Sequence, residues 1–253
     1  MEDPSFNYEK RGIQYSTQRK TDPGIAAYIM KEIGDAGRIL NVGAGAGSYE
    51  PDDREVVSVE PSPAMRKQRI LLSRRPAIDA KADALPFEDN SFDASMALLT
   101  VHHWPDIKKG LTELRRVTKG QIIIMTFDPD TLDTFWNVNC FPKLIEVEKE
   151  RYPTISSLTD ILGAQVKVIP VPVTLNCLDG FQEAYYGRPE EFLKPEVRKA
   201  QSAWGFLSDG LEEEYVLKLE TELLNGEWDR KFGFYRVKKE CCMALRLIVD
   251  RPI

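Results

Sequence analysis

The chain has 253 residues, which is long enough for one large α/β domain or two small ones whose core needs no disulfide or metal. Its 34 Lys and Arg against 40 Asp and Glu give a net charge of -6, which argues against a nucleic-acid partner, because phosphate neutralisation requires clustered basic residues. The four cysteines form no C-x-x-C pair and have no histidine at zinc spacing, so we predict free thiols and no metal site.

The amino-terminal stretch M-E-D-P-S-F-N-Y-E-K-R is polar and charged, so it lacks the apolar core of a signal peptide. No stretch reaches the roughly 18 apolar residues that a membrane helix needs. We therefore expect a soluble, cytoplasmic protein that does not insert into a membrane.

Expected helices and strands alternate in the first half of the chain. The first helix is expected from Pro23 to about Ile33, with Asp22 as its N-cap. The elements expected after it are strands at 38–42 and 55–60, a helix at 63–72 capped by Ser62, strands at 78–81 and 92–99, a helix at 107–117 and a strand at 121–127. This alternation predicts a parallel, right-handed, doubly wound sheet.

After Asp128 the pattern changes. The elements expected there are a short helix at 158–162, a strand at 166–173, helices near 189–207 and 210–224, and a last strand at 241–249. Because the segment 178–231 lies between two late strands, we interpret it as a helical cap over the sheet rather than an independent domain.

Three glycines at alternate positions, Gly43, Gly45 and Gly47, end the first expected strand. Glycine permits positive φ, and its missing Cβ lets a ligand lie against the main chain. A loop at the carboxyl end of the first parallel strand is where open α/β sheets bind nucleotide-like ligands. The same glycine spacing also occurs in plain tight turns, so the loop alone does not establish a site.

Polar or aromatic residues follow each of the next three expected strands. Glu60 ends the second strand, and its carboxylate can accept hydrogen bonds from both hydroxyls of a ribose. Asp83 follows the third, where it can accept from an exocyclic amine beside an apolar wall at 85–87, and H-H-W at 102–104 follows the fourth. A helix cap, a turn former and a core aromatic are the alternatives for these residues. Their shared position at strand carboxyl ends favours a ligand site.

These motifs resemble the class I S-adenosylmethionine-dependent methyltransferases, in particular the small-molecule group related to ubiquinone and menaquinone biosynthesis enzymes. The resemblance lies within 38–127 and rests on I-L-N-V-G-A-G-A-G-S-Y, V-S-V-E-P-S-P-A-M, A-D-A-L-P-F-E-D-N-S-F-D and H-H-W. It implies a single domain over 1–253 with a Rossmann-like, doubly wound, seven-stranded, mostly parallel sheet, an antiparallel last strand and a helical cap. It also implies S-adenosylmethionine as cofactor and in-line methyl transfer to a small-molecule acceptor.

The resemblance also assigns cofactor contacts. In that family the glycine loop packs against the methionine portion, the acid after the second strand holds the ribose, and the Ala-Asp-Ala segment binds adenine. The residues carried over are Asn41, Gly43, Ala44, Gly45, Gly47, Glu60, Pro61, Ser62, Met65, Asp83, Ala84, Leu85 and Leu99. The family usually has an acidic residue where this chain has Asn41, which puts in doubt a water-bridged contact to the amino group of the cofactor.

The lead segment 1–22 is a second candidate for cofactor contact. We hypothesise that Arg19 pairs with the cofactor carboxylate and that Tyr15 closes over the methionine end, as lead segments of the family often do. A solvent-facing helix is the alternative.

Histidines and aromatic residues are the candidates for the acceptor side. His102 or His103 can serve as a base if the acceptor needs one, and a role in ordering the backbone is the alternative. An apolar, flat acceptor would suit an aromatic lining, for which the candidates are Trp104, Trp136, Tyr185 and Tyr186. Ordinary core packing is the alternative for these side chains.

Two other functions compete with methyl transfer. A nicotinamide-dependent oxidoreductase shares the turn and the acid after the second strand, but it normally has Gly-x-Gly-x-x-Gly, and it does not explain A-D-A-L-P-F. A non-catalytic S-adenosylmethionine-binding protein of the same fold is the second, and release of S-adenosylhomocysteine discriminates against it.

Overall fold

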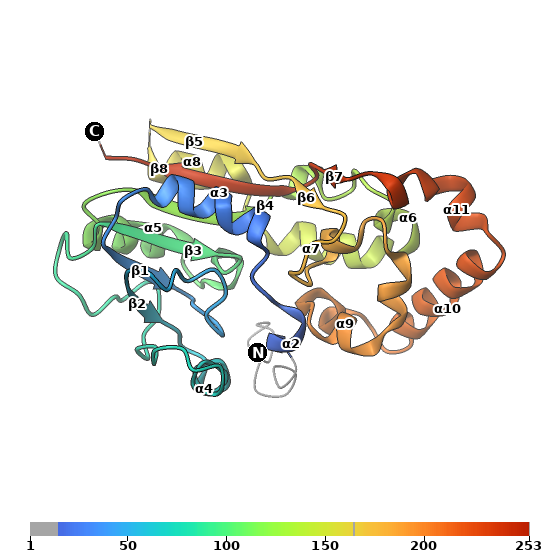
Figure 1. Cartoon of the computed structure of the whole chain (residues 1–253), viewed down its shortest axis with the longest axis horizontal. Coiled ribbons are helices and arrows are strands. Elements are labelled where there is room, and N and C mark those ends of the chain that lie inside the picture. Colours follow the sequence, from blue (N-terminus) through green and yellow to red (C-terminus); the bar gives the residue numbers. More distant parts are fainter. Residues whose placement is uncertain (1–14, 164, 253) are drawn as a thin grey trace.

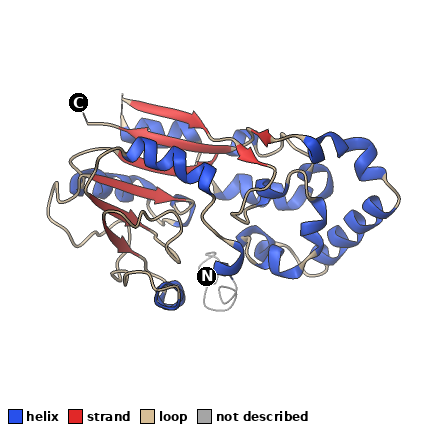
Figure 2. Cartoon of the chain, viewed as in Figure 1, coloured by secondary structure: helices blue, strands red, loops and turns tan. Residues whose placement is uncertain are grey.

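The computed structural model describes residues 15–163 and 165–252, and of Tyr15 and Ser16 it describes the backbone alone. A six-stranded sheet forms one end of this described part (Figures 1 and 2). Its strands are β1 (Arg38–Val42), β2 (Glu55–Val59), β3 (Ala94–Leu98), β4 (Ile122–Phe127), β5 (Val166–Pro170) and β8 (Leu245–Asp250). Their order is β2-β1-β3-β4-β8-β5, and β8 is antiparallel to both of its neighbours, whereas β2, β1, β3 and β4 pair in parallel. The predicted mostly parallel sheet with an antiparallel last strand is confirmed.

The predicted seven-stranded sheet was wrong by one strand, because the expected strand at 78–81 is a single bridging residue. Ile78 pairs with Val59, donating its N–H to the Ser58 carbonyl at 2.8 Å and accepting the Glu60 N–H at 3.0 Å. On the amino-terminal side the next donor of this ladder would be Pro76, which has no N–H. On the other side the Arg66 guanidinium donates a hydrogen bond to the Glu60 carbonyl at 2.8 Å, at the acceptor that the next ladder bond would use. Each extension of the ladder therefore lacks a hydrogen bond that would hold it.

The two late strands that were predicted as continuous are each divided. β5 ends at Pro170, and the chain continues as β6 (Val173–Thr174), which pairs with β7 (Glu240–Cys241) in a separate two-stranded sheet. The predicted strand at 241–249 therefore becomes β7 and β8. Proline at 170 and 172 removes two ladder donors, which explains why β5 does not extend.

Helices cover both faces of the large sheet. On one face, α3 (Pro23–Ile33) buries its isoleucines against a cluster that includes Ile39 and Met96, and the Asp22 carboxylate accepts the Ile25 N–H at 3.1 Å as the predicted N-cap. On the other face, α5 (Ile107–Val117) and α8 (Ile155–Leu162) pack on a second cluster built around β1 and β4. The short α2 (Tyr15–Gln18) precedes α3, and α4 (Pro63–Leu71) follows β2 with Ser62 as its N-cap.

A helical region forms the other end of the molecule (Figure 1). It contains α6 (Asn137–Cys140), α7 (Pro142–Arg151), α9 (Pro195–Lys199), α10 (Leu211–Leu224) and α11 (Glu227–Phe232), around a core of Trp136, Phe141, Phe192, Trp204 and Trp228. It thus includes residues before 178 as well as the expected cap. The predicted helix at 189–207 is three short helical segments. Pro195 explains the first break, because it holds the preceding Lys194 extended at φ -81° and ψ 121°. None of the described helices is long and apolar enough to cross a membrane.

Candidate functional site

A cavity of about 540 Å³ opens at the carboxyl ends of β1, β2 and β3. The loop after β1, the turn after β2 and the segment after β3 all contribute to its wall, as expected for a parallel sheet. Twelve of the residues singled out in the sequence line it: Arg19, Asn41, Gly43, Ala44, Gly45, Glu60, Pro61, Ser62, Met65, Leu99, His103 and Trp104. We refer to it below as the outer cavity.

The glycine loop is held against β2 and against the segment after β3. The Gly43 and Ala44 N–H groups both donate to the Val59 carbonyl, at 2.9 and 3.0 Å. Gly43 has φ +69°, and a Cβ at this position would overlap the Thr100 hydroxyl. A side chain at Gly43 is therefore excluded by backbone conformation and by space together.

Glu60 is fixed in place by the main chain at the edge of the outer cavity. One carboxylate oxygen accepts the Gly45 N–H at 2.8 Å, and the other accepts the Ser62 N–H at 2.8 Å. Burial raises the pKa of this carboxyl, and the two backbone N–H groups act in the opposite direction. Each oxygen keeps a second lone pair, so the carboxylate can accept two further hydrogen bonds from a ligand.

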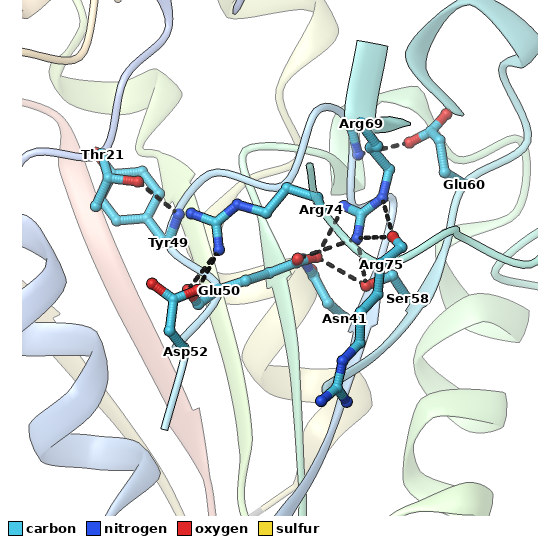
Figure 3. Close-up of polar contacts among 11 residues, drawn as sticks. Thr21, Asn41, Tyr49, Glu50, Asp52, Ser58, Glu60, Arg69, Arg74 and Arg75 are labelled. Atoms are coloured by element: carbon cyan, nitrogen blue, oxygen red, sulfur yellow. Dashed lines mark hydrogen bonds and ion pairs between the residues drawn. The ribbon is translucent and has the colours of Figure 1, made fainter. Parts of the chain in front are cut away.

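A buried ion pair lies beneath the glycine loop (Figure 3). The Glu50 carboxylate accepts from Arg69 Nη1 at 2.9 Å and Nη2 at 3.0 Å, from Asn41 Nδ2 at 2.9 Å and from Ser58 Oγ at 2.8 Å. Arg69 is fully buried, and a Cβ on Gly47 would lie 2.9 Å from its Nη1. Gly47 therefore packs on this ion pair and does not line the outer cavity.

This network gives a physical reason for Asn41. Its amide nitrogen donates to the Glu50 carboxylate, whereas a carboxylate at position 41 would place two negative charges in contact. In this chain the carboxylate beneath the loop comes from position 50, and an uncharged donor at position 41 suits it.

Residues 18–22, which we call the strap, cross from the glycine loop to Asp179. The Arg19 Nε lies 2.5 Å from the Asp179 carboxylate, which also accepts from the Tyr49 hydroxyl at 2.9 Å. At the other side of the loop the Tyr49 N–H donates to Thr21 Oγ1 at 2.9 Å (Figure 3). Burial first, and then the charge of Asp179, raise the pKa of Tyr49, so its hydroxyl remains a donor. Arg19, Tyr49 and Asp179 all line the outer cavity.

A second, smaller cavity of about 40 Å³ adjoins the outer one and extends toward the helical region. The two share Arg19, Leu99 and His103. Its remaining lining is His102, Phe127, Leu132, Phe135, Asn137, Glu148, Tyr152, Phe181, Gln182, Glu183, Gln201 and Ser202. We refer to it as the inner cavity. Most of these residues lie beyond 127, outside the motifs of the first half.

The two histidines occupy different positions relative to the cavities. His103 lines both, whereas His102 lines the inner cavity and stacks between His103 and Tyr152, at ring-centroid distances of 4.0 and 4.2 Å. Burial lowers the pKa of His103 to about 3 and that of His102 well below its usual range. Both imidazoles are therefore neutral at pH 7.

Several residues singled out in the sequence lie away from both cavities. Of the adenine segment, Ala80, Lys81 and Ala82 line the outer cavity, and Asp83, Ala84 and Leu85 do not. Trp136, Tyr185 and Tyr186 pack in the aromatic core, where Trp136 donates to the Tyr186 carbonyl at 2.7 Å. The Tyr15 side chain lies outside the described residues.

Sequence reasoning missed Thr100 and Tyr49 in the outer cavity and Glu148 and Asn137 in the inner one. Tyr49 ends the glycine motif and Thr100 directly follows an expected strand, so position along the chain could have indicated both. Leu99 and Tyr49 have φ of 53° and 63°, and such backbone strain gathers at functional sites. The residues from α6 and α7 carry no motif that could have indicated them.

Comparison with known proteins shows what the motif-bearing half of the chain is similar to. Residues 40–125 match the family model described as a methyltransferase domain. A ubiquinone/menaquinone biosynthesis C-methyltransferase, UbiE, of Geobacter sp. is 32% identical over 130 residues, which are 43% of this chain and 54% of that protein. An uncharacterised protein of Methanocaldococcus jannaschii, MJ1252, is 28% identical over 145 residues, which are 55% of this chain and 57% of that protein. The chain thus spans about half the length of these curated relatives.

A solved structure resembles nearly the whole chain. It is a putative methyltransferase from an antibiotic biosynthesis pathway of Anabaena variabilis, with a TM-score of 0.85 and 28% identity. The match covers 93% of this chain and 99% of that one, so it includes the helical region as well as the sheet.

Proposed function

The chain belongs to the class I S-adenosylmethionine-dependent methyltransferases, and from that premise we propose that it transfers a methyl group to a small-molecule acceptor by in-line displacement. The observation that carries the proposal is the pair of adjoining cavities, which meet at Arg19, Leu99 and His103. In this proposal the outer cavity binds S-adenosylmethionine, and the inner cavity binds the acceptor.

The residues of the outer cavity fit S-adenosylmethionine. The glycine loop presents main chain at a place where a Cβ on Gly43 would not fit, and Glu60 presents two oriented carboxylate oxygens for ribose hydroxyls. Met65, Ala80 and Ala82 supply apolar surface for the adenine. Arg19 offers a cation for the carboxylate of the methionine portion. In this proposal the strap is the part of the lead segment that covers the cofactor.

When bound, S-adenosylmethionine supplies an electrophilic methyl group on a positively charged sulfonium. The part left to the protein is to align the nucleophile with that methyl group and to exclude water. His103 is the histidine placed at the junction of the cavities, and we assign it the contact with the acceptor. Its pKa of about 3 makes it a neutral but weak proton acceptor at pH 7, so its main contribution is a hydrogen bond that orients the acceptor.

The first test is cofactor binding. Calorimetric titration of the purified chain with S-adenosylhomocysteine is expected to show a one-to-one complex, and Glu60→Gln should weaken it about tenfold by removing a charge-assisted hydrogen bond. Glu55→Gln is the matched control, because Glu55 is exposed at the opposite end of β2 and should bind as the unaltered chain does. Tight binding of a nicotinamide cofactor without S-adenosylhomocysteine would contradict the proposal.

The second test is turnover. Incubating the chain with an isotopically labelled methyl donor and a metabolite extract should yield a labelled small molecule together with S-adenosylhomocysteine. Binding without S-adenosylhomocysteine release over a broad acceptor panel would favour a non-catalytic binding protein instead.

A further inference from the structure

Unpartnered polar atoms gather around the inner cavity. Among the described residues, eight buried side-chain nitrogen or oxygen atoms have no hydrogen-bond partner. Four of the eight belong to residues that line this cavity: His102 Nδ1, Asn137 Oδ1, Glu183 Oε2 and Gln201 Nε2. Buried polar groups are almost always paired, so a cluster of exceptions around one cavity indicates a ligand that pairs them.

Three of these side chains are almost completely buried and held in place by their other polar atom. Asn137, Glu183 and Gln201 are 1%, 1% and 4% exposed. Asn137 Nδ2 donates to Gln182 Oε1 at 3.1 Å, and Glu183 Oε1 accepts the Ala244 N–H at 2.7 Å. Gln201 Oε1 accepts the Trp204 indole N–H at 3.1 Å. One end of each side chain is therefore fixed, and the other end remains for a ligand.

The free ends define the chemistry of the ligand. Asn137 Oδ1 can only accept, and the Glu183 carboxylate accepts, whereas Gln201 Nε2 can only donate. The rest of the wall includes apolar side chains, among them Leu99 and Phe127, and further polar ones, among them Arg19 and Glu148. A hydrocarbon in this position would leave the three polar atoms unpaired, and each unpaired atom would make the free energy of binding less favourable.

We propose that the inner cavity binds the polar head of the acceptor, a small group that presents N–H or O–H donors to Asn137 and Glu183 and a hydrogen-bond acceptor to Gln201. This inference rests on the proposed function and narrows its substrate class from any small molecule to one with such a head. It differs from the flat, apolar acceptor that an aromatic lining would suit. Of the four aromatic residues on which that expectation rested, Trp136, Tyr185 and Tyr186 lie in the core, and Trp104 lines the outer cavity.

Two fragments of the same size and shape test the proposal. Acetamide carries N–H donors and a carbonyl, and acetone carries the carbonyl alone. Their binding to the full chain saturated with S-adenosylhomocysteine can be measured at pH 8.5 by saturation-transfer NMR on the methyl protons. We expect acetamide to bind about fivefold more tightly than acetone, the scale of one hydrogen bond.

Two substitutions that invert donor and acceptor make the test specific to this cavity. Glu183→Gln replaces the free acceptor by a donor and keeps an oxygen for the Ala244 N–H, so the preference for acetamide should vanish or reverse. Gln201→Glu replaces the free donor by an acceptor and keeps an oxygen for Trp204, so the preference should increase. Glu32→Gln is the control with an unchanged preference, because Glu32 is a buried carboxylate that pairs with Lys167 and Arg251 away from both cavities. Circular dichroism checks that each variant is folded, and either cavity variant is sufficient if the other does not fold.

The outcomes separate this inference from the proposed function. Absence of S-adenosylhomocysteine binding overturns the proposed function itself. If S-adenosylhomocysteine binds, then equal binding of the two fragments, a preference for acetone, no binding of either, or a preference that neither cavity variant changes overturns the polar acceptor site alone.

Discussion

Asn41 shows at the scale of one residue how the glycine loop is supported. Its amide donates to Glu50 at 2.9 Å within a fully buried ion pair, so Asn41→Asp would replace a hydrogen bond by repulsion between carboxylates. We expect this variant to lose about 2 to 3 kcal/mol of unfolding free energy at pH 7, the range for an uncompensated buried group.

Urea denaturation measures this loss, with Asn139→Asp on an exposed helical position as the control. Because the charge of Glu50 and burial both disfavour ionisation of the carboxyl that the substitution introduces, that carboxyl gains a proton more readily at low pH, and the loss should shrink at pH 5. A variant as stable as the unaltered chain at pH 7 would show that Glu50 does not set the requirement at position 41.

Glu183 gives the inner cavity a pH dependence that can be measured without a ligand. Burial raises its pKa to about 7, whereas the pKa of a glutamate in an unfolded chain is about 4.3. Between these two values the folded chain therefore holds a proton that the unfolded chain releases. The contribution of Glu183 to the free energy of unfolding is fully present below about pH 4.3 and is lost as the pH rises through about 7.

The comparison that isolates this effect is between the unaltered chain and Glu183→Gln. Between pH 5 and pH 8 the unaltered chain should lose about 2.5 kcal/mol of unfolding free energy relative to the variant. Urea denaturation at the two pH values measures the difference, and Glu55→Gln corrects for the loss of an exposed carboxylate. A constant difference between the two chains would show that Glu183 does not titrate in this range.

At the scale of elements, the sequence predicted best the strands whose signal is local. β1 and β4 are buried along almost their whole length, so each is a mainly apolar run that ends at a recognisable residue. The expected strand at 78–81, I-D-A-K, has a much weaker apolar signal, and its pairing also depends on Pro76 and on the Arg66 guanidinium, which reaches it from α4. The prediction of one continuous helix at 189–207 was wrong, and its first break has a cause that is visible in the sequence, namely the proline at 195.

The two cavities also differ in how far the sequence predicts the residues that line them. The outer cavity is built from three loops that each follow a predicted strand, so a motif read along the chain could indicate its residues. The inner cavity combines side chains from α6, α7 and the segments near 183 and 201, which are far apart in sequence. None of these segments has a periodicity or motif that specifies a partner, so only the folded chain brings Asn137 and Glu183 to one site.

At the scale of the whole molecule, the strap joins the sheet to the helical region. It bonds to the glycine loop through Thr21 and to the segment near 180 through Arg19 and through the Gln18 carbonyl, which accepts the Gly180 N–H at 3.0 Å. Since Arg19 lines both cavities, cofactor and acceptor would each contact the residue that ties the two regions together.

Hydrogen exchange tests this coupling, because the amides of Tyr49 and Gly180 both donate to the strap. Arg19→Ala should accelerate exchange at both amides by about tenfold or more through local opening, while Ile124 in the centre of β4 exchanges as before. Arg19→Lys is the matched control that keeps the charge opposite Asp179 and should fall between the two chains. S-adenosylhomocysteine should slow exchange at Gly180 in the unaltered chain and do so much less in Arg19→Ala, because ligand binding stabilises only the form that holds it. If exchange at Gly180 responds neither to the substitution nor to the ligand, the strap does not couple the outer cavity to the helical region.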